Sequence, residues 1–319
     1  MRERIAAALL DVAGNADKNV RNAAAWAFAG LARRSATGNR WLERAATSDV
    51  ARVRFLAARA FRFLEQPWEP CPTAPFESLL PLLGDEVESV RWAAAGALSS
   101  RALSLARVPG EPHENEENII NRLVAATTDS SPTVRAAAVS GLGRSQNERA
   151  VRARLAGLRD RDRRVRLEAS YANRDTAAIR ALIEALDDEY VWVRNNAART
   201  LGGLKARSAV PALLRKLESS RRDTRAEAAL ALATIGDLRA VEPLLALFER
   251  ATTVEVRVPV AEALGRLGDE RAVPVLTAAL QDTGQERGRR VGDRPFYPLR
   301  RAAADALRRI EGTPPPRLP

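Results

Sequence analysis

The sequence predicts an all-α fold, an α-solenoid of about nine antiparallel helical hairpins. Three observations indicate this. First, 46% of the 319 residues are apolar but only 5% are aromatic, and alanine supplies much of the apolar share, which is typical of close-packed helices rather than sheets. Second, a Val-Arg pair returns along the chain with a basic spacing of about 31 residues. Third, the apolar residues after each pair follow the period of one helix face.

Each predicted repeat is marked by this Val-Arg pair or a close variant. The nine pairs are Val20-Arg21, Val53-Arg54, Val90-Arg91, Val134-Arg135, Val165-Arg166, Val193-Arg194, Thr224-Arg225, Val256-Arg257 and Leu299-Arg300. Counted from the first residue of the pair as zero, small residues fall at +4 and +7 in almost every copy, and most copies carry large apolar residues at +8 and +11. This alternation lets adjacent helices approach closely and interlock. A second amphipathic segment precedes the pair, as at 178–186, 209–217, 241–248 and 272–280, so each unit is predicted to be a helical hairpin.

The repeated pattern V-R-x-x-A-A-x-A-L, as in residues 90–98, resembles the HEAT repeat, specifically the short subclass named after the phycobilisome lyases. The resemblance covers residues 1–311 and implies hairpins that stack to share a continuous core. It also implies a ladder in which an acidic residue in the turn pairs with the arginine at +1. An acidic residue lies within six positions upstream in eight of the nine copies: Asp17, Asp49, Glu88, Asp129, Asp162, Asp188, Asp223 and Glu255.

We expect a single solenoid over residues 1–311, with insertions near 65–75, 99–118 and 283–298 and a proline-rich tail at 312–319. Three copies depart from the pattern, and the ninth does so by carrying Leu299-Arg300 in place of Val-Arg after a long loop. In the fifth, Asn173 and Thr176 replace the large apolar residues, so the helix that starts at Val165 should stop near Ala172, with Asn173 as a left-handed cap and a local bend there. In the eighth, Pro259 at +3 should lie in the first turn of its helix, where a missing N–H costs little.

Positions +2 and +6 point away from the apolar stripe and should face solvent. If the second helices line the inner curve, as in the solenoids that this chain resembles, these positions form the inner surface. Large side chains there predict a partner-binding surface of Trp26, Phe55, Arg59, Trp92 and Tyr171. The alternative is that the inserted loops, especially residues 65–75, fold back and bury these rings.

The net charge of +11 resides in two windows, residues 144–166 and 287–301. These basic patches contain Arg152, Arg154, Arg161, Arg163, Arg164, Arg287, Arg289, Arg290 and Arg294. They could contact phosphates. The chain has only three lysines, Lys18, Lys205 and Lys216, so a codon bias toward arginine explains part of the basic charge as well as phosphate binding does. Acidic residues also interleave with the arginines, which weakens the case for nucleic-acid binding.

Several chemistries find no support in the residue inventory. The single cysteine, Cys71, and the single histidine, His113, fall in separate insertions, so they predict neither a nucleophilic pair nor a metal site. The sequence has no glycine-rich phosphate loop and no metal-ligand spacing. We therefore expect no enzyme activity, no cofactor and no metal. The longest apolar run, residues 23–32, is too short to span a bilayer, and the N-terminus does not read as a signal peptide, so we expect a cytoplasmic, bacterial protein.

The predicted function is that of a non-enzymatic scaffold or adaptor, which binds a partner protein or peptide on the inner surface and the insertion loops. Two alternatives stay open. One is nucleic-acid binding, resembling the HEAT-type alkylpurine DNA glycosylases but without clear catalytic residues. The other is a bilin lyase subunit, which follows from the name of the repeat subclass. The identity of the partner and the oligomeric state are left open.

Overall fold

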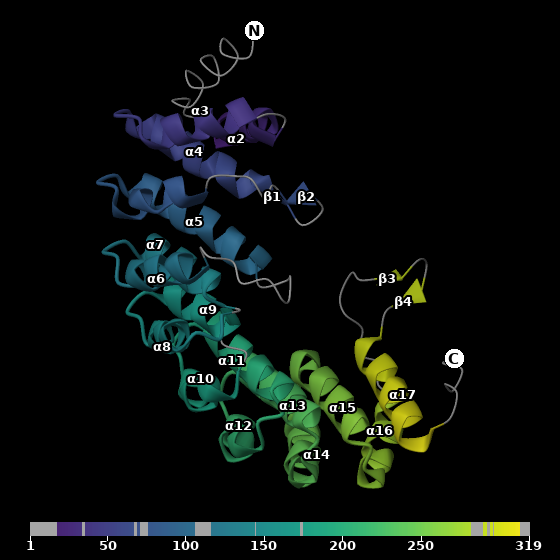
Figure 1. Ribbon diagram of the computed structural model, residues 1–319. Helices are drawn as coiled ribbons and strands as arrows, with labels where there is room; N and C mark the ends of the chain where they lie inside the picture. Colours follow the sequence, from purple (N-terminus) through teal and green to yellow (C-terminus); the bar gives the residue numbers. More distant parts are fainter. Residues whose placement is uncertain are drawn as a thin grey trace. The chain divides into compact units, whose positions relative to one another are not determined.

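The computed structural model describes residues 18–33, 36–66, 69–70, 76–105, 116–143, 145–172, 175–281, 290–291, 294–295 and 297–312. Within this part of the chain the regular structure is helical apart from two short antiparallel strand pairs, which confirms the all-α prediction. By its internal contacts the chain divides into two compact units, Met1–Asn173 and Arg174–Pro319. In each unit the helices follow one another in sequence order (Figure 1).

The first unit stacks five second helices side by side: α2 (Lys18–Arg33), α4 (Ala51–Leu64), α5 (Glu88–Leu105), α7 (Pro132–Gly141) and α9 (Arg163–Ala172). The first segments of its hairpins are α3 (Ala36–Ala46), the 3-10 helices η1 (Phe76–Leu79) and η2 (Pro81–Gly84), α6 (Glu116–Ala126) and α8 (Glu148–Gly157). Strands β1 (Glu65–Gln66) and β2 (Glu69–Pro70) pair antiparallel, with Glu65 opposite Pro70.

The second unit stacks four second helices: α11 (Val191–Gly203), α13 (Arg222–Ile235), α15 (Val254–Leu267) and α17 (Pro298–Glu311). The first segments begin with a 3-10 turn that runs into an α-helix: η3 (Thr176–Ala178) with α10 (Ile179–Ala185), η4 (Arg207–Ala209) with α12 (Val210–Lys216), η5 (Leu238–Ala240) with α14 (Val241–Arg250), and η6 (Glu270–Ala272) with α16 (Val273–Ala279). Strands β3 (Arg290–Val291) and β4 (Arg294–Pro295) form the second antiparallel pair.

The Val-Arg periodicity predicts the second helices correctly. All nine pairs lie in the first turn of a second helix. The residue at +4 is buried in every copy, at no more than 3% exposed: Ala24, Ala57, Ala94, Ala138, Ala169, Ala197, Ala228, Val260 and Ala303. An alanine buries little apolar area by itself, so a core of this kind gains its cohesion from close helix contacts repeated many times.

Two glycines show how closely the second helices approach. A Cβ on Gly141 of α7 would lie 2.3 Å from Ser99 Oγ and 2.7 Å from Ser99 Cα of α5. A Cβ on Gly265 of α15 would lie 2.5 Å from both Cα and Cβ of Ala306 on α17. Only glycine fits at either position without moving a helix.

The structure tests the predicted departures of the fifth and eighth copies. Helix α9 ends at Ala172, as expected, and the division between the units follows the next residue. Asn173 itself lies outside the described residues, and the bend stays a prediction. The expectation for Pro259 is wrong: α15 begins at Val254, so Pro259 lies in the second turn of the helix. The error arose because the helix begins two residues before the Val-Arg pair.

The insertion predicted from residue 99 also needs correction. Residues 99–105 are helical and belong to α5, and residues 116–118 belong to α6. Cys71, His113 and the tail from residue 313 lie outside the described residues. No helix within the described part of the chain is long and apolar enough to cross a membrane.

Candidate functional site

The arginine at +1 binds the turn before its own helix. In Arg54, Arg91, Arg135, Arg166 and Arg194, Nη1 donates to the two backbone carbonyls five and six residues upstream, at 2.9–3.2 Å. These bonds satisfy carbonyls at the end of the preceding segment, which have no partner within a helix. The same guanidinium therefore holds each hairpin turn in place.

The other edge of the guanidinium reaches an aspartate of the next repeat. Nε and Nη2 donate to one carboxylate in Arg54–Asp85 (2.5 and 3.0 Å), Arg91–Asp129 (2.8 and 3.1 Å) and Arg135–Asp160 (both 2.8 Å). Each of these aspartates stands five positions before the Val and also accepts the backbone N–H two residues on. In the second unit Arg194 binds Asp223 and Thr224 instead.

The ladder expected from the resemblance is thus present, with two of its acceptors reassigned. Asp129 and Asp223 are acceptors, as predicted. Asp85 and Asp160 take the places expected for Glu88 and Asp162. Glu88 accepts from Ser131 and Thr133, while Asp162 binds Arg164. In the first unit the carboxylate comes from position −5, at the end of the preceding segment, whereas Asp223 in the second unit stands at −1.

Burial and hydrogen bonding act in opposite directions on these aspartates. Burial alone would raise the pKa of Asp85, Asp129 and Asp160. The hydrogen bonds from the paired arginine and from the backbone N–H outweigh it, so the pKa of each lies below its usual value. At neutral pH the ladder carboxylates are charged and paired, and these arginines are not available to a ligand.

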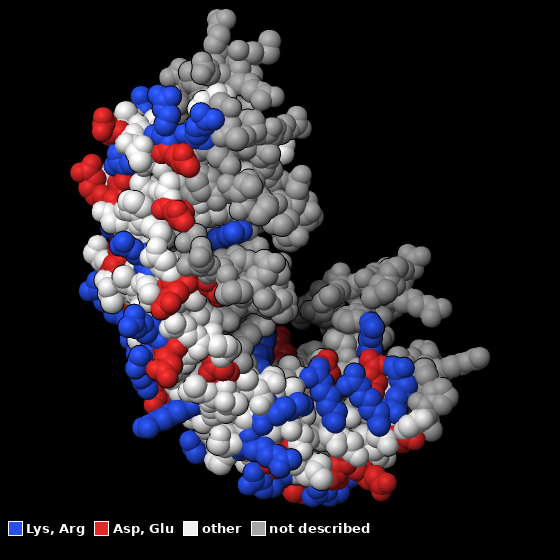
Figure 2. Space-filling model, viewed as in Figure 1, with Lys and Arg blue, Asp and Glu red and all other residues white. Residues whose placement is uncertain are grey.

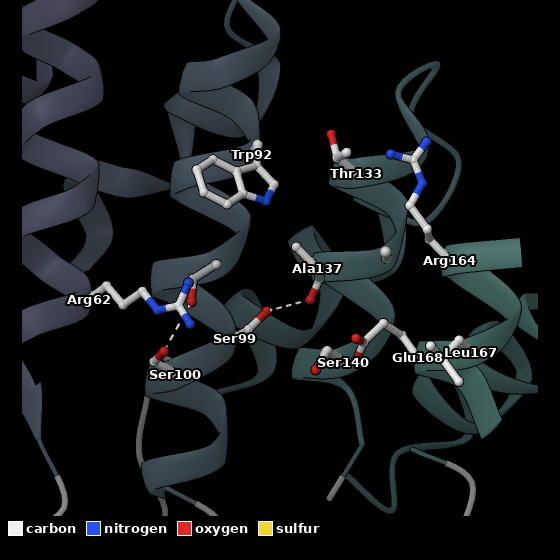
Figure 3. A pocket seen from close by; sticks show the side chains of 12 residues that line it. Arg62, Trp92, Ser99, Ser100, Thr133, Ala137, Ser140, Arg164, Leu167 and Glu168 are labelled. Atoms are coloured by element: carbon white, nitrogen blue, oxygen red, sulfur yellow. Dashed lines mark hydrogen bonds between the residues drawn. The ribbon is translucent and has the colours of Figure 1, made fainter. Parts of the chain in front are cut away.

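A groove of about 430 Å³ runs across the second helices of the first unit. It is lined by Arg62, Trp92, Gly96, Ser99, Ser100, Thr133, Ala136, Ala137, Ser140, Arg164, Leu167 and Glu168. Figure 3 shows Trp92 and Arg62 on one side, Arg164, Leu167 and Glu168 on the other, and Ala137 between them. The residues come from α4, α5, α7 and α9, so the groove crosses four consecutive repeats.

The groove exists because side-chain size varies between repeats at the same positions. Copy four carries Ala136 at +2 and Ser140 at +6, whereas its neighbours carry Trp92 and Leu167 at +2. Gly141 lets α7 approach α5 closely, and Ser99 Oγ lies 2.7 Å from the carbonyl oxygen of Ala137. Small residues thus form the floor, and one large apolar side chain rises on each side.

The structure brings together part of the predicted partner-binding set. The Arg59 guanidinium lies over the rings of Phe63, at 5.9 Å, and Trp92, at 5.4 Å, and donates to Asn22. Trp92 and Phe55 are half-buried and pack against the core. Trp26 and Tyr171 are exposed, at 68% and 44%, and neither lines the groove.

Several groove residues were not foreseen. Arg62, Ser99 and Ser100 lie at +9 and +10, beyond the positions that the sequence pattern singled out. The available signal was the pair of small residues at +2 and +6 in copy four, between repeats with large ones. Trp192 was also missed: it stands at −1 on α11 and is 53% exposed.

The basic patches differ from the prediction at one residue. Arg154 is buried, at 1% exposed, and its Nη1 donates to the carbonyls of Leu142 and Ser145 just beyond α7. Arg154 therefore supplies hydrogen bonds to carbonyls at the end of α7 and does not belong to a surface patch. Arg152, Arg161 and Arg163 are exposed, and Arg164 is exposed but paired with Asp162, whose pKa this contact lowers to about 2.

The second basic window is only partly described. Arg290 and Arg294 lie in β3 and β4, while Arg287 and Arg289 lie outside the described residues. On the face drawn in Figure 2, acidic and basic side chains intersperse over both units. This face therefore lacks the continuous positively charged surface that would follow a phosphate backbone.

Comparison with known proteins identifies the repeat. The HEAT repeat family matches residues 179–257, and the PBS lyase HEAT-like repeat matches residues 256–282. This chain contains HEAT repeats. The resemblance inferred from the Val-Arg pattern is therefore confirmed, and HEAT repeats generally mediate protein binding. No curated relative matches the sequence.

Solved structures agree on the fold. YibA of Escherichia coli is 20% identical with a TM-score of 0.59, and the match covers 94% of this chain and 98% of YibA. An importin beta structure is 17% identical with a TM-score of 0.71, and the match covers 98% of this chain but only 45% of importin beta. At these identities the likeness shows the fold alone, a HEAT-repeat α-solenoid.

The bilin lyase alternative gains no support from the fold. The complex of CpcE and CpcF of phycocyanin lyase from Nostoc is 20% identical, and the match covers 78% of this chain and 98% of that one. Its TM-score is only 0.43, too low to support an argument about function.

Proposed function

We propose that this chain is a non-enzymatic scaffold or adaptor whose groove on α4, α5, α7 and α9 binds an extended segment of a partner protein. The observation that supports the proposal is the groove itself, with Trp92 and Leu167 on either side of a floor of alanine, glycine and serine. Stacked repeats suit this task because they offer a large preordered surface, which lowers the entropic cost of binding.

The lining indicates which partner segment would fit. An apolar side chain between Trp92 and Leu167 would bury apolar area on both sides, the arrangement found at binding hot spots. Hydroxyls of Ser100, Thr133 and Ser140 line the groove beside it and could bond a partner backbone. Arg62 lines one end of the groove, and Arg164 and Glu168 line the other, so the partner segment should carry an apolar anchor flanked by polar residues.

The proposal is tested by filling the groove with a large side chain and measuring partner binding. The native complex is purified, its partner identified, and binding of the purified partner measured by calorimetry. Ala136→Trp places a ring on the groove floor and should weaken binding at least tenfold, about 1.4 kcal/mol. Ala125→Trp is the matched control: the same change in the same hairpin, on an exposed position of α6. It should leave the affinity within about twofold.

The outcome can contradict the proposal in two ways. Equal affinity of the Ala136→Trp variant and wild type would place the partner elsewhere. Binding to duplex DNA or RNA that falls steeply with salt concentration, and is unaffected by the groove variant, would favour the nucleic-acid alternative.

A further inference from the structure

One ladder arginine in the second unit keeps its donors but has no acidic partner within the described part of the chain. Arg225 of α13 donates from Nη1 to the Ser219 carbonyl at 2.6 Å, as the other ladder arginines bind their own turns. Position −5 of the next repeat, where earlier copies carry Asp85, Asp129 and Asp160, is Ala251. Among the described residues no carboxylate forms an ion pair with Arg225.

The backbone at Ala251 has the conformation that the ladder uses elsewhere. Its φ and ψ are −74° and 126°, and those of Asp85 are −60° and 143°. Each residue follows the last turn of its segment, and each donates its N–H back to that turn, Ala251 to Leu247 and Asp85 to Leu82. An oxygen ligand at Ala251 would therefore face Arg225 as the Asp85 carboxylate faces Arg54.

The remaining donors are also in place. In the first unit the aspartate accepts the N–H two residues on, as Asp85 does from Val87. The equivalent N–H is that of Thr253, for which the described part of the chain supplies no acceptor. The Thr253 hydroxyl oxygen is buried and has no hydrogen-bond partner there either. Buried polar groups are rarely left unpaired, so a ligand that bonds them gains free energy.

These groups line a pocket of about 380 Å³ between the turn after α12 and the turn after α14. Arg222, Arg225 and Arg250 contribute three positive charges, against Glu218, which is bound to Arg250 at 2.6 Å. Glu255 occupies the register of Asp223, the residue that serves Arg194, but it is exposed and makes no ion pair among the described residues. The pocket is net positive and larger than a single carboxyl group requires.

We propose that this pocket binds a carboxylate group supplied by another molecule, held by Nε and Nη2 of Arg225 and by the Thr253 N–H and hydroxyl. The carboxylate is preferred over other oxyanions because an arginine edge and a backbone N–H hold an aspartate in the same way in three repeats of this chain. The site lies in the second unit and is independent of the groove in the first.

The experiment uses the whole chain, labelled with ¹⁵N, and succinate at constant ionic strength. The Arg225 Nε–Hε resonance, assigned by its loss in Arg225→Lys, should shift saturably with succinate and not with succinamide. Ala251→Asp supplies the carboxylate from the chain itself. It should weaken succinate binding at least tenfold and raise the midpoint of thermal unfolding without ligand. Leu238→Asp, which adds the same charge at an exposed site outside the pocket, is the matched control and should bind as wild type.

Three other outcomes would overturn the proposal. Unchanged succinate affinity in Ala251→Asp would place the anion away from Arg225. Inorganic phosphate that binds more tightly than succinate would assign a different oxyanion. Succinate binding that appears only in Glu255→Gln would mean that Glu255 already serves Arg225 in solution. Should Ala251→Asp fail to fold, the shift of the Arg225 resonance in wild type decides the matter alone.

Discussion

Arg91 and Arg135 show at the residue scale why arginine, and not lysine, stands at +1. One guanidinium nitrogen bonds two turn carbonyls, while Nε and Nη2 hold the aspartate of the next repeat side by side. A lysine has a single ammonium and no planar fork, so it could not do both. The ladder therefore neutralises three arginines of the first unit, Arg54, Arg91 and Arg135.

The ladder makes stability depend on pH. The pKa of Asp160 lies below its unfolded value, near 3.9, since the bonds from Arg135 and the Asp162 N–H outweigh burial. A carboxyl whose folded pKa is depressed contributes its full stability above the unfolded pKa and loses it as pH falls through the folded value. Asp160→Asn should destabilise the protein by about 1–3 kcal/mol at pH 7 and lose less between pH 5 and pH 3 than wild type does, measured by urea unfolding.

The control for this prediction is Glu249→Gln, an exposed position of α14. It should change the free energy of unfolding by less than about 0.5 kcal/mol at pH 7. A pH profile of Asp160→Asn that parallels wild type would show that the Arg135 pair does not contribute to acid unfolding.

The elements themselves were predictable, because each repeat obeys the same steric rule. The residue at +4 is buried in all nine copies, and a large apolar residue stands at +8 in eight of them, so the copies agree on which face packs. The end of α9 at Ala172 followed from the loss of large residues after it. The groove was not predictable, since it depends on differences between neighbouring repeats and on the approach of α7 to Ser99, which no single copy reveals.

Ladder acceptors were predictable only in part. Glu88 and Asp162 were predicted as acceptors because they lie close in sequence to the Val-Arg pair. The ion pair with the arginine of the previous repeat instead uses a carboxylate at the end of the preceding segment, as at Asp85 and Asp160. Similarly, the sequence predicts Arg154 to be an exposed charge. Its burial could not be predicted, because the carbonyls to which it donates belong to the preceding hairpin.

Helix α15 carries a proline where a helix does not favour one. Pro259 in the second turn cannot donate to the Glu255 carbonyl and crowds that turn. Pro259→Ala should therefore stabilise the protein by about 1 kcal/mol, after the greater entropy of the unfolded chain has offset part of the gain. Thermal unfolding measures the change.

Pro274→Ala is the matched control, because Pro274 lies at the start of α16, where the missing N–H costs little. It should be neutral or slightly destabilising. If Pro259→Ala lowers the unfolding midpoint as Pro274→Ala does, the ring of Pro259 contributes packing that outweighs the missing hydrogen bond.

At the scale of the whole molecule, a repeat protein is a chain of nearest-neighbour interfaces. Each hairpin buries its apolar face only against the hairpins beside it, so a local change spreads through successive interfaces and weakens with distance. The chain divides into two compact units after Asn173, where α9 has just ended. Local unfolding of one unit should therefore be detectable while the other unit stays folded.

Gly265→Ala tests this directly. The added methyl would meet Ala306 at 2.5 Å and force α15 and α17 apart, at a cost of about 1–3 kcal/mol. Hydrogen exchange should speed up in α13, α15 and α17 while α4, α5 and α7 keep wild-type protection. Gly30→Ala, inside α2 with no atom within 4 Å of the new methyl, should leave all helices as protected as before or more so. Uniform loss of protection over both units in Gly265→Ala would mean that the chain unfolds as one cooperative body, and the nearest-neighbour description would then not apply to it.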